Sequence, residues 1–492
     1  MNQIRIIFTS DIHGYFYPTD YTDRIKKAKG LLHIAQYFHK DGNTMILDGG
    51  DTLQGSPFSY YSQMKEIPEV AAELMNKAGY DVVTLGNHDF NYGSQYLHTY
   101  LEHLKAVCVC ENCTNKKNGK SLFPWRVFQM ENGIRIGVVG AVTDFINIWE
   151  KKENLEQMKI DSTYESVVKA YEEVKNQADF TICLYHGGME CDIDTEEILE
   201  TTGENVGYKI CKNLGFDLLL TGHQHMPITG RKIHGTYVVQ NMSNADTYHE
   251  IQIEFDSVVR IQSKMISASE LPLRESEFPF WNVERNVQNW LDSVVGHIPE
   301  DLYPEEHLKM ALYGSKLADF INEAQQAYTG AEISCTSLAN QVHGIPKEVK
   351  VRDILLTYPF PNTLVVLEIT GKLLKEALEH SAEYFTVKEG RIQISERFLK
   401  PKEEHYNFDF YKGVTYQIDY NRPIGRRISE IRVQKQLVSP EKTYRICMNN
   451  YRASGAGGYK MYTQGKIIRQ YGKDIFEVLL EYINNYGKNY EL

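Results

Sequence analysis

The feature that most constrains this sequence is a pattern that recurs through its first half. A short apolar run, of the length of a β-strand, ends in a cluster of aspartate, histidine and asparagine residues. The apolar runs cover residues 4–9, 44–47, 82–85, 180–185 and 218–220. The clusters that follow them are Ser10-Asp11-Ile12-His13-Gly14, Asp48-Gly49-Gly50-Asp51, Gly86-Asn87-His88-Asp89-Phe90-Asn91, His186-Gly187-Gly188 and Thr221-Gly222-His223-Gln224-His225.

The stretches between these runs have the apolar spacing of amphipathic helices, which predicts helices over 25–39, 66–78, 164–177 and 198–214. Strands that alternate with helices predict a layered α/β domain. Sheets of that kind bind their ligands beyond the carboxyl ends of the strands. The five polar clusters are therefore expected to meet in one cleft.

The residue types in these clusters suit a metal site. Imidazole and carboxylate in one coordination shell favour borderline divalent ions such as manganese, zinc or iron. Two such ions about 3.5–4 Å apart need a bridging carboxylate and clamp the attacking and leaving oxygens of a displacement reaction. One cluster alone is more often a satisfied core or loop residue, but five in order are hard to assign to chance.

The pattern stops near residue 270. The prediction is a first domain over 1–270, a connector over 271–300 that contains a helix over 281–295, and a second domain over 301–492. The second domain has no clusters at its strand ends, and its mixed texture predicts an α+β fold. Its expected helices span 315–328, 372–384 and 475–486, and its expected strands span 363–369, 414–419 and 444–448.

Composition excludes several classes of protein. The 492 residues carry a formal net charge of −12, and such a chain lacks the positive field of a protein that coats nucleic-acid polymers. No apolar stretch is long enough to span a bilayer. The N-terminus leads straight into a strand rather than a secretory segment, and the eight cysteines are too few and scattered for a disulfide framework, so a cytoplasmic location is expected. The alternative is an exported protein whose leader has been removed. Cys108, Cys110 and Cys113 could bind zinc, although alternating cysteines also suit a strand.

Taken together, Asp11-x-His13, Gly49-Gly50-Asp51, Gly86-Asn87-His88-Asp89, His186 and Gly222-His223-x-His225 resemble the motifs of the calcineurin-like metallophosphoesterase superfamily. The resemblance covers residues 4 to about 260. It implies a four-layer α/β/β/α sandwich, two β-sheets flanked by helices, with a dinuclear metal site.

The resemblance also assigns the ligands. Asp11, His13 and His225 would hold one ion, with His225 at a place where some relatives of the 5′-nucleotidase type have glutamine. The other ion would be held by the remaining strand-end donors, Asn87, His186 and His223. Asp51 would bridge the two ions.

His88 would face the substrate in this resemblance, where it stabilises the phosphoryl transition state or protonates the leaving oxygen. A histidine titrates near neutrality and suits either task. Many 5′-nucleotidases pair this histidine with an aspartate three residues on. This chain has Asn91 there, which can orient the ring but cannot hold an imidazolium by charge.

The second half resembles the nucleotide-binding domain that accompanies this phosphoesterase domain in bacterial nucleotidases. The segments 358–365, 407–419 and 449–455 carry the resemblance, and the last two are closest to the 2′,3′-cyclic-nucleotide 2′-phosphodiesterase/3′-nucleotidase branch. In that branch two aromatics sandwich the base, and here they would be Phe408 and Tyr451. Without the resemblance, both would be read as core aromatics in a chain with 33 tyrosines.

One departure from the family bears on the substrate. Typical 5′-nucleotidases carry an Asn-Gly-Gly-x-Arg stretch, whereas residues 338–344 here contain Asn340 but no arginine. Asn340 could remain a ligand contact. The missing arginine weakens the 5′-nucleotidase interpretation and favours cyclic or 3′-phosphate substrates.

The sequence therefore predicts a nucleotide phosphohydrolase with two divalent ions, acting as a 2′,3′-cyclic-nucleotide 2′-phosphodiesterase, a 3′-nucleotidase or both, by in-line attack of a metal-bound hydroxide. A 5′-nucleotidase or nucleotide-sugar hydrolase is the nearest alternative. A nucleotide sensor without catalysis and a protein phosphatase are further ones. The sequence leaves the oligomeric state open.

Overall fold

The computed structural model describes residues 3–200, 202–256, 258–274, 277–360, 362–400 and 402–486. These residues form two compact units, divided between Gln288 and Asn289. None of the helices in the described ranges combines the length and apolar character that crossing a bilayer requires.

The first unit is built on two sheets that face each other. In spatial order, one sheet contains β15 (Val259–Ser267), β14 (Thr247–Phe255), β1 (Gln3–Thr9), β2 (Thr44–Asp48), β3 (Val82–Val83) and β4 (Val107–Cys108). The other contains β12 (Ile228–Ile233), β13 (Thr236–Gln240), β11 (Leu218–Thr221), β10 (Phe180–His186), β8 (Arg135–Val142) and β7 (Arg126–Gln129). The strands β1 to β4 are parallel, as are β8, β10, β11 and β13. The carboxyl ends of the central strands in each sheet therefore lie together.

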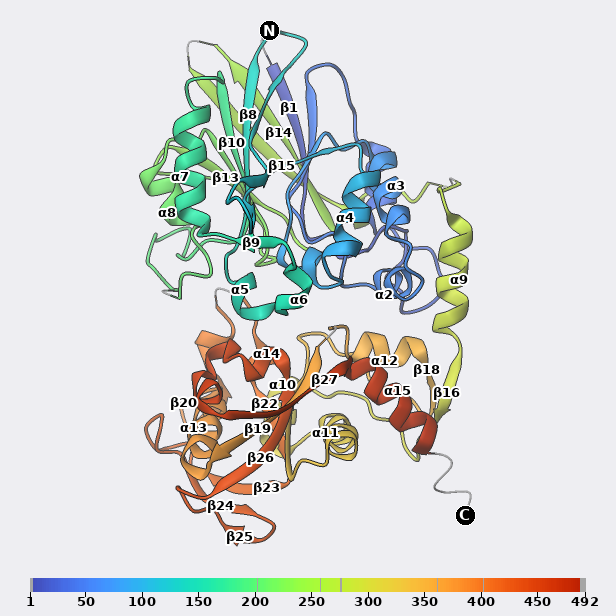
Figure 1. The fold of residues 1–492 in the computed structure, drawn as a ribbon, viewed down its shortest axis with the longest axis vertical. Helices are drawn as coiled ribbons and strands as arrows, with labels where there is room; N and C mark the ends of the chain where they lie inside the picture. The colour runs from blue at the N-terminus through green and yellow to red at the C-terminus, as the bar shows by residue number, and fades with distance from the viewer. Residues whose placement is uncertain are drawn as a thin grey trace. The chain divides into compact units, whose positions relative to one another are not determined.

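Helices cover the outer faces of both sheets (Figure 1). The helices of this unit are α1 (Leu31–Ile34), α2 (Pro57–Met64), α3 (Pro68–Ala78), α4 (Ser94–His103), α5 (Ile146–Trp149), α6 (Lys152–Leu155), α7 (Thr163–Val174) and α8 (Gly207–Asn213), and α9 (Trp281–Leu291) contains the division between the units. Short 3₁₀ turns add η1 (Ala35–Tyr37), η2 (Asn87–Phe90) and η3 (Ala268–Glu270), and a small sheet adds β6 (Ser121–Phe123), β5 (Cys110–Asn115) and β9 (Met158–Ile160). This arrangement confirms the predicted four-layer sandwich.

Alternating apolar residues explain why the two sheets pack. Ile4, Ile6 and Phe8 of β1 point into the same buried cluster as Ile182 and Leu184 of β10. The opposite face of β10 packs against Val167, Ala170 and Val174, which lie on one face of α7. A strand with both faces covered is predominantly apolar, and β10 is buried along its whole length.

The second unit has a mixed sheet of its own, as the α+β prediction requires. Its strands in spatial order are β22 (Asp409–Lys412), β17 (Ile333–Ser337), β26 (Thr443–Asn449), β19 (Thr363–Thr370) and β27 (Lys466–Asp474). Its smaller sheets contain β16 (Val294–His297) with β18 (Glu348–Lys350), β20 (Phe385–Lys388) with β21 (Arg391–Ile394), and β23 (Val414–Ile418) with β24 (Ile428–Val433) and β25 (Gln436–Leu437). Its helices and 3₁₀ turns are α10 (His307–Tyr313), α11 (Lys316–Thr329), α12 (Val351–Thr357), α13 (Gly371–Ala382), α14 (Asn450–Ala453), α15 (Ile475–Tyr486), η4 (Glu396–Phe398), η5 (His405–Asn407), η6 (Ala456–Gly458) and η7 (Lys460–Gln464).

The structure differs from the prediction in the connector. Residues 271–288 belong to the first unit because Tyr17 donates its hydroxyl to the carbonyls of Pro279 and Phe280, and Tyr21 donates to Glu284. The helix predicted to end at residue 295 ends at Leu291, since Val294–His297 pairs with another strand.

Two predicted helices of the first unit are shorter than expected. The helix expected to begin at residue 25 begins at Leu31, because Asp20 and Asp23 accept the backbone N–H groups of Thr22 and Ile25 and hold that segment in turns. The helix expected over 198–214 begins at Gly207. Before Gly207, the Glu200 carboxylate accepts the backbone N–H groups of Thr202, Gly203 and Asn205 and holds them in a loop.

Candidate metal centre

The strand ends bring together every residue predicted as a metal ligand. Asp11 and His13 follow β1, and Asp51 follows β2. Asn87 opens the 3₁₀ turn η2 after β3. His186 is the last residue of β10, and the pair His223 and His225 follows β11.

The backbone at these ends is held in an uncommon conformation. The positive φ values are 55° at Asp11, 51° at His13, 59° at Asp51, 71° at His223 and 57° at His225. Each such residue costs of order 1–3 kcal/mol and persists only when its surroundings fix it. Here the N–H of Asp11 donates to the carbonyl of Gly50, and that of His13 donates to the carbonyl of Asp51, both at 2.8 Å. Strain concentrated on these side chains points to a functional site.

One glycine makes the close approach of two of these loops possible. A Cβ at Gly86 would lie 2.1 Å from Oδ1 and 2.3 Å from the backbone nitrogen of Asp51. Only glycine allows the turn after β3 to pass this close to the turn after β2.

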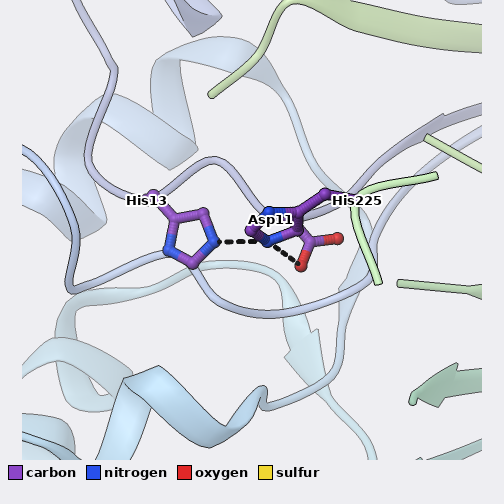
Figure 2. Close-up of side chains that lie close together, drawn as sticks. All are labelled: Asp11, His13 and His225. Atoms are coloured by element: carbon purple, nitrogen blue, oxygen red, sulfur yellow. Dashed lines mark hydrogen bonds and ion pairs between the residues drawn. The ribbon is translucent and has the colours of Figure 1, made fainter. Parts of the chain in front are cut away.

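Asp11, His13 and His225 form a first group of potential ligands (Figure 2). The Nε2 atoms of His13 and His225 lie 3.0 Å apart, and Nε2 of His225 lies 3.4 Å from Oδ1 of Asp11. Nδ1 of His13 faces the carbonyl of Gln54 at 2.8 Å, so it donates a proton there. This leaves the lone pair of His13 on Nε2, the atom that lies beside Nε2 of His225.

Asp51, His186 and His223 form a second group. Nε2 of His186 lies 3.1 Å from Oδ2 of Asp51, and its Nδ1 donates to the carbonyl of Gly49 at 2.7 Å. Nδ1 of His223 lies 2.9 Å from Oδ1 of Asn87, which joins Asn87 to this group. Asp51 lies between the groups, because its Oδ2 is also 4.0 Å from Nε2 of His13.

The charges of the two groups depend on each other. Burial opposes ionisation of Asp51, but His186, His88 and His13 outweigh it and hold the pKa of Asp51 well below its ordinary value. Burial likewise opposes a charged His186, but Asp51 and then Asp11 raise the pKa of His186 to about 10. Burial lowers the pKa of His13 to about 4. The buried carboxylates thus demand positive charge, which divalent cations would supply.

The residues fit divalent ions on a further ground. Oδ2 of Asp11 is buried and accepts no hydrogen bond, although an unpaired buried carboxylate oxygen is costly. Within the described residues, these two groups are the sets of histidine, cysteine, aspartate and glutamate whose ligand atoms gather closely enough for a metal. The cysteine trio is not among them, and Cys108 and Cys110 lie in or beside the strands β4 and β5.

Two supporting residues were not predicted. Oε1 of Glu204 lies 2.9 Å from Nε2 of His223, and the ring of Trp149 stacks on that histidine with centroids 5.6 Å apart. A carboxylate on the second ring nitrogen orients a metal-binding imidazole. Glu204 lies in the loop that the sequence had suggested as helix, so its position could not be inferred from spacing.

Asp89 supports Asp51 from behind. Its carboxylate accepts the backbone N–H groups of Gly86, Asp51, Thr52 and Leu53 at 2.8–3.0 Å. This single side chain therefore fixes the turns after β2 and β3 together.

His88 and Asn91 are in contact, as predicted for the substrate-facing pair. Nδ1 of His88 lies 2.8 Å from Oδ1 of Asn91, and the backbone N–H of His88 donates to Oδ1 of Asp51 at 2.7 Å. Asn91 also donates its amide to Oε2 of Glu150 at 2.6 Å. The histidine is thereby held beside the metal groups.

The predicted base-binding residues lie in the second unit. Phe408 is 5% exposed, and its ring packs against Tyr384, Phe385 and Phe410 with centroids 4.9–5.6 Å apart. Tyr451 is half-buried. The buried pair formed by Asp409 and Arg452, 3.0 Å apart, joins the segments that carry the two aromatics.

Asn340 has a structural task in the same unit. Its Nδ2 donates to the carbonyl of Glu403 at 2.7 Å, and its Oδ1 accepts the backbone N–H of His405 at 3.0 Å. Both ends of the amide hold the loop before η5, and a role in ligand binding stays a prediction.

Removing one ligand should change the number of bound ions. We expect wild-type protein to bind two Mn²⁺ ions per chain and His186→Ala to bind fewer. Chelation should destabilise the wild type by about 2–4 kcal/mol, because bound ligand stabilises only the folded state. Metal analysis by mass spectrometry and thermal melting with and without EDTA measure both effects. The control is His98→Ala, which removes an exposed histidine, and equal metal content in His186→Ala and wild type would contradict the assignment.

Asp48, behind the metal groups, should impose a pH dependence on stability. Burial raises the pKa of Asp48 to about 7. Between the ordinary pKa and this value the folded state keeps a proton that the unfolded state has released, so stability falls as pH rises. In Asp48→Asn the amide replaces the protonated acid, and the loss of stability with rising pH disappears.

In metal-free protein, Asp48→Asn should therefore gain about 1–3 kcal/mol relative to wild type between pH 5 and pH 8, measured by urea unfolding. The matched control is Asp194→Asn, whose side chain is 76% exposed. A difference between Asp48→Asn and wild type that stays constant with pH would refute the buried, protonated carboxyl.

Comparison with known proteins agrees with this geometry. Residues 4–227 match the calcineurin-like phosphoesterase family, and residues 294–464 match the 5′-nucleotidase C-terminal domain. The chain is 25% identical, over 98% of its length, to the trifunctional nucleotide phosphoesterase protein YfkN of Bacillus subtilis, and it spans 38% of that relative. It is also 25% identical to the 2′,3′-cyclic-nucleotide 2′-phosphodiesterase/3′-nucleotidase of Haemophilus influenzae, over 92% of this chain and 80% of the relative.

A solved structure matches almost the whole chain as well. A Staphylococcus aureus protein provisionally named a 5′-nucleotidase, crystallised in complex with alpha-ketoglutarate, superposes with a TM-score of 0.92. It is 32% identical, over 98% of this chain and 97% of that one. Sequence, fold and strand-end ligands thus lead to one conclusion: the chain belongs to the hydrolase family that joins a calcineurin-like phosphoesterase domain to a 5′-nucleotidase C-terminal domain.

Proposed function

We propose that this enzyme hydrolyses nucleotide phosphoesters at a site that binds two divalent ions, with 2′,3′-cyclic nucleotides and 3′-nucleotides as substrates. The observation that carries the proposal is the pair of ligand groups at the strand ends, with Asp51 between them. Asp11, His13 and His225 would hold one ion, and Asn87, His186 and His223 the other. Manganese, zinc and iron suit this mixture of imidazole and carboxylate.

When bound, two such ions neutralise the phosphoryl oxygens and activate the water for an in-line displacement. The chain's own part is to hold a proton donor beside them. Nδ1 of His88 donates to Asn91, so the ring would donate to the departing ribose oxygen from Nε2 when both of its nitrogens carry a proton.

The preference for cyclic and 3′-phosphate substrates has two supports. The first is the name of the Haemophilus influenzae relative. The second is the segment over 338–344, which lacks the arginine of typical 5′-nucleotidases and whose Asn340 is engaged with backbone groups. A 5′-nucleotidase is the second candidate, because the Staphylococcus aureus relative that is 32% identical carries that provisional name.

A cytoplasmic location is part of the proposal, and cysteine chemistry supports it. All eight cysteines lie among the described residues and are free, and seven of them are buried. Unpaired thiols are typical of a reducing compartment.

Initial rates with Mn²⁺ distinguish the candidates. We expect kcat/KM for 2′,3′-cyclic AMP and 3′-AMP to exceed that for 5′-AMP. His88→Ala should lower kcat by about 10²–10⁴-fold, the usual contribution of a positioned general acid. A much higher rate with 5′-AMP would establish the second candidate instead, and nucleotide binding without hydrolysis in the wild type would favour a sensor.

The same assay tests the base-binding residues. Tyr451→Ala should raise KM for all nucleobases to a similar degree and leave kcat unchanged, because stacking is largely indifferent to the base. Phe408→Ala should also lower the melting temperature, since its ring is packed in an aromatic cluster. An unchanged KM in Tyr451→Ala would remove that residue from the substrate site.

A further inference from the structure

The contact between Asn91 and Glu150 gives the asparagine a second partner that the motif does not predict. Glu150 lies between α5 and α6, 59 residues along the chain from Asn91. Its Oε2 accepts the amide of Asn91 at 2.6 Å. His88, Asn91 and Glu150 therefore form a continuous chain of hydrogen bonds.

Glu150 is itself firmly held as an acceptor. Its Oε1 accepts the backbone N–H of Lys151 at 2.7 Å and Nδ2 of Asn154 at 2.8 Å. The same Asn154 amide also donates to the backbone carbonyl of Asn91 at 3.0 Å, which ties the two segments together. Both oxygens of Glu150 thus face N–H donors, which favour the ionised carboxylate and oppose the burial that raises the pKa of Glu150.

This environment determines which way the Asn91 amide points. A carboxylate can only accept, so the NH₂ end of Asn91 must face Glu150 and its oxygen must face His88. The amide oxygen can also only accept, so Nδ1 of His88 must be the donor at 2.8 Å. The Nε2 atom is then the one left to serve the substrate.

Resting on the function proposed above, we propose that Glu150 is a positioning residue for His88. It acts through Asn91 and fixes the proton of His88 on Nδ1. An aspartate at position 91 would place a negative charge directly beside His88, and here Glu150 supplies that charge from behind Asn91. Asn91 orients the ring of His88, and Glu150 supplies the negative charge. The hydrogen bonds of Glu150 go to Asn91, Lys151 and Asn154 and to none of the candidate metal ligands among the described residues, so its removal should leave metal binding intact.

The first experiment replaces the carboxylate by an amide of the same shape. Glu150→Gln should lower kcat for 2′,3′-cyclic AMP by about 10- to 100-fold, the range typical of residues that orient a functional histidine. KM, bound Mn²⁺ and the melting temperature should stay close to wild type. The matched control is Glu153→Gln, an exposed glutamate three residues away, and equal kcat in the two variants would overturn the proposal.

The second experiment moves the charge. Asn91→Asp alone places two carboxylates where the amide and Glu150 now meet at 2.6 Å, so kcat should fall and the local structure should loosen. The double variant Asn91→Asp/Glu150→Gln restores one carboxylate and one amide, now with the charge next to His88. It should recover most of the wild-type kcat, and a double variant no better than Asn91→Asp alone would contradict the proposal.

A third readout does not depend on activity. In ¹⁵N NMR spectra of the wild type, the neutral ring of His88 should carry its proton on Nδ1. In Glu150→Gln this tautomer preference should weaken, because the side-chain amide of Asn91 is free to flip. Identical His88 spectra in the two proteins would overturn the role of Glu150. If the wild type hydrolysed no phosphoester but its spectra showed this dependence, the proposed function would fail and the positioning role would stand.

Discussion

Two buried carboxylates, Asp11 and Asp51, impose the constraint on which the rest of the first unit depends. Both are at most 1% exposed, and one oxygen of Asp11 accepts no hydrogen bond. Burying a negative charge without compensation is prohibitive, so positive charge must gather around them. The four histidines of the two ligand groups, His13, His186, His223 and His225, come from three different strand ends, and the two sheets must pack face to face to assemble them.

The backbone conforms to the same constraint. Five of the predicted ligands hold positive φ values, and the carboxylate of Asp89 ties the turns after β2 and β3 with four backbone hydrogen bonds. The strained backbone at this edge lowers the stability of the folded state, and burial of the apolar cluster between the sheets compensates for that loss. Such strain at a ligand-rich edge is what a preorganised catalytic site requires.

The predicted ligands lie together because each one is local to its strand. A parallel strand delivers the residues after its carboxyl end to one edge, so the motif and the apolar run together place Asp11 or His186 without knowledge of distant contacts. The sequence could not predict that the described residues before Leu31 and before Gly207 form turns rather than helix, since the side chains of Asp20, Asp23 and Glu200 accept backbone N–H groups that the periodicity would assign to a helix. Glu150 and Glu204 could not be predicted for a different reason. Glu150 contacts Asn91 and Glu204 contacts His223 through the tertiary fold, and no local spacing in the sequence indicates either contact.

If the two ligand groups bind two cations, anomalous diffraction from Mn²⁺-soaked crystals will locate both ions. We expect two anomalous peaks in each chain, one among Asp11, His13 and His225 and one among Asn87, His186 and His223, with Asp51 in contact with both. A single peak, or peaks elsewhere in the chain while these residues remain hydrogen-bonded to one another, would contradict it.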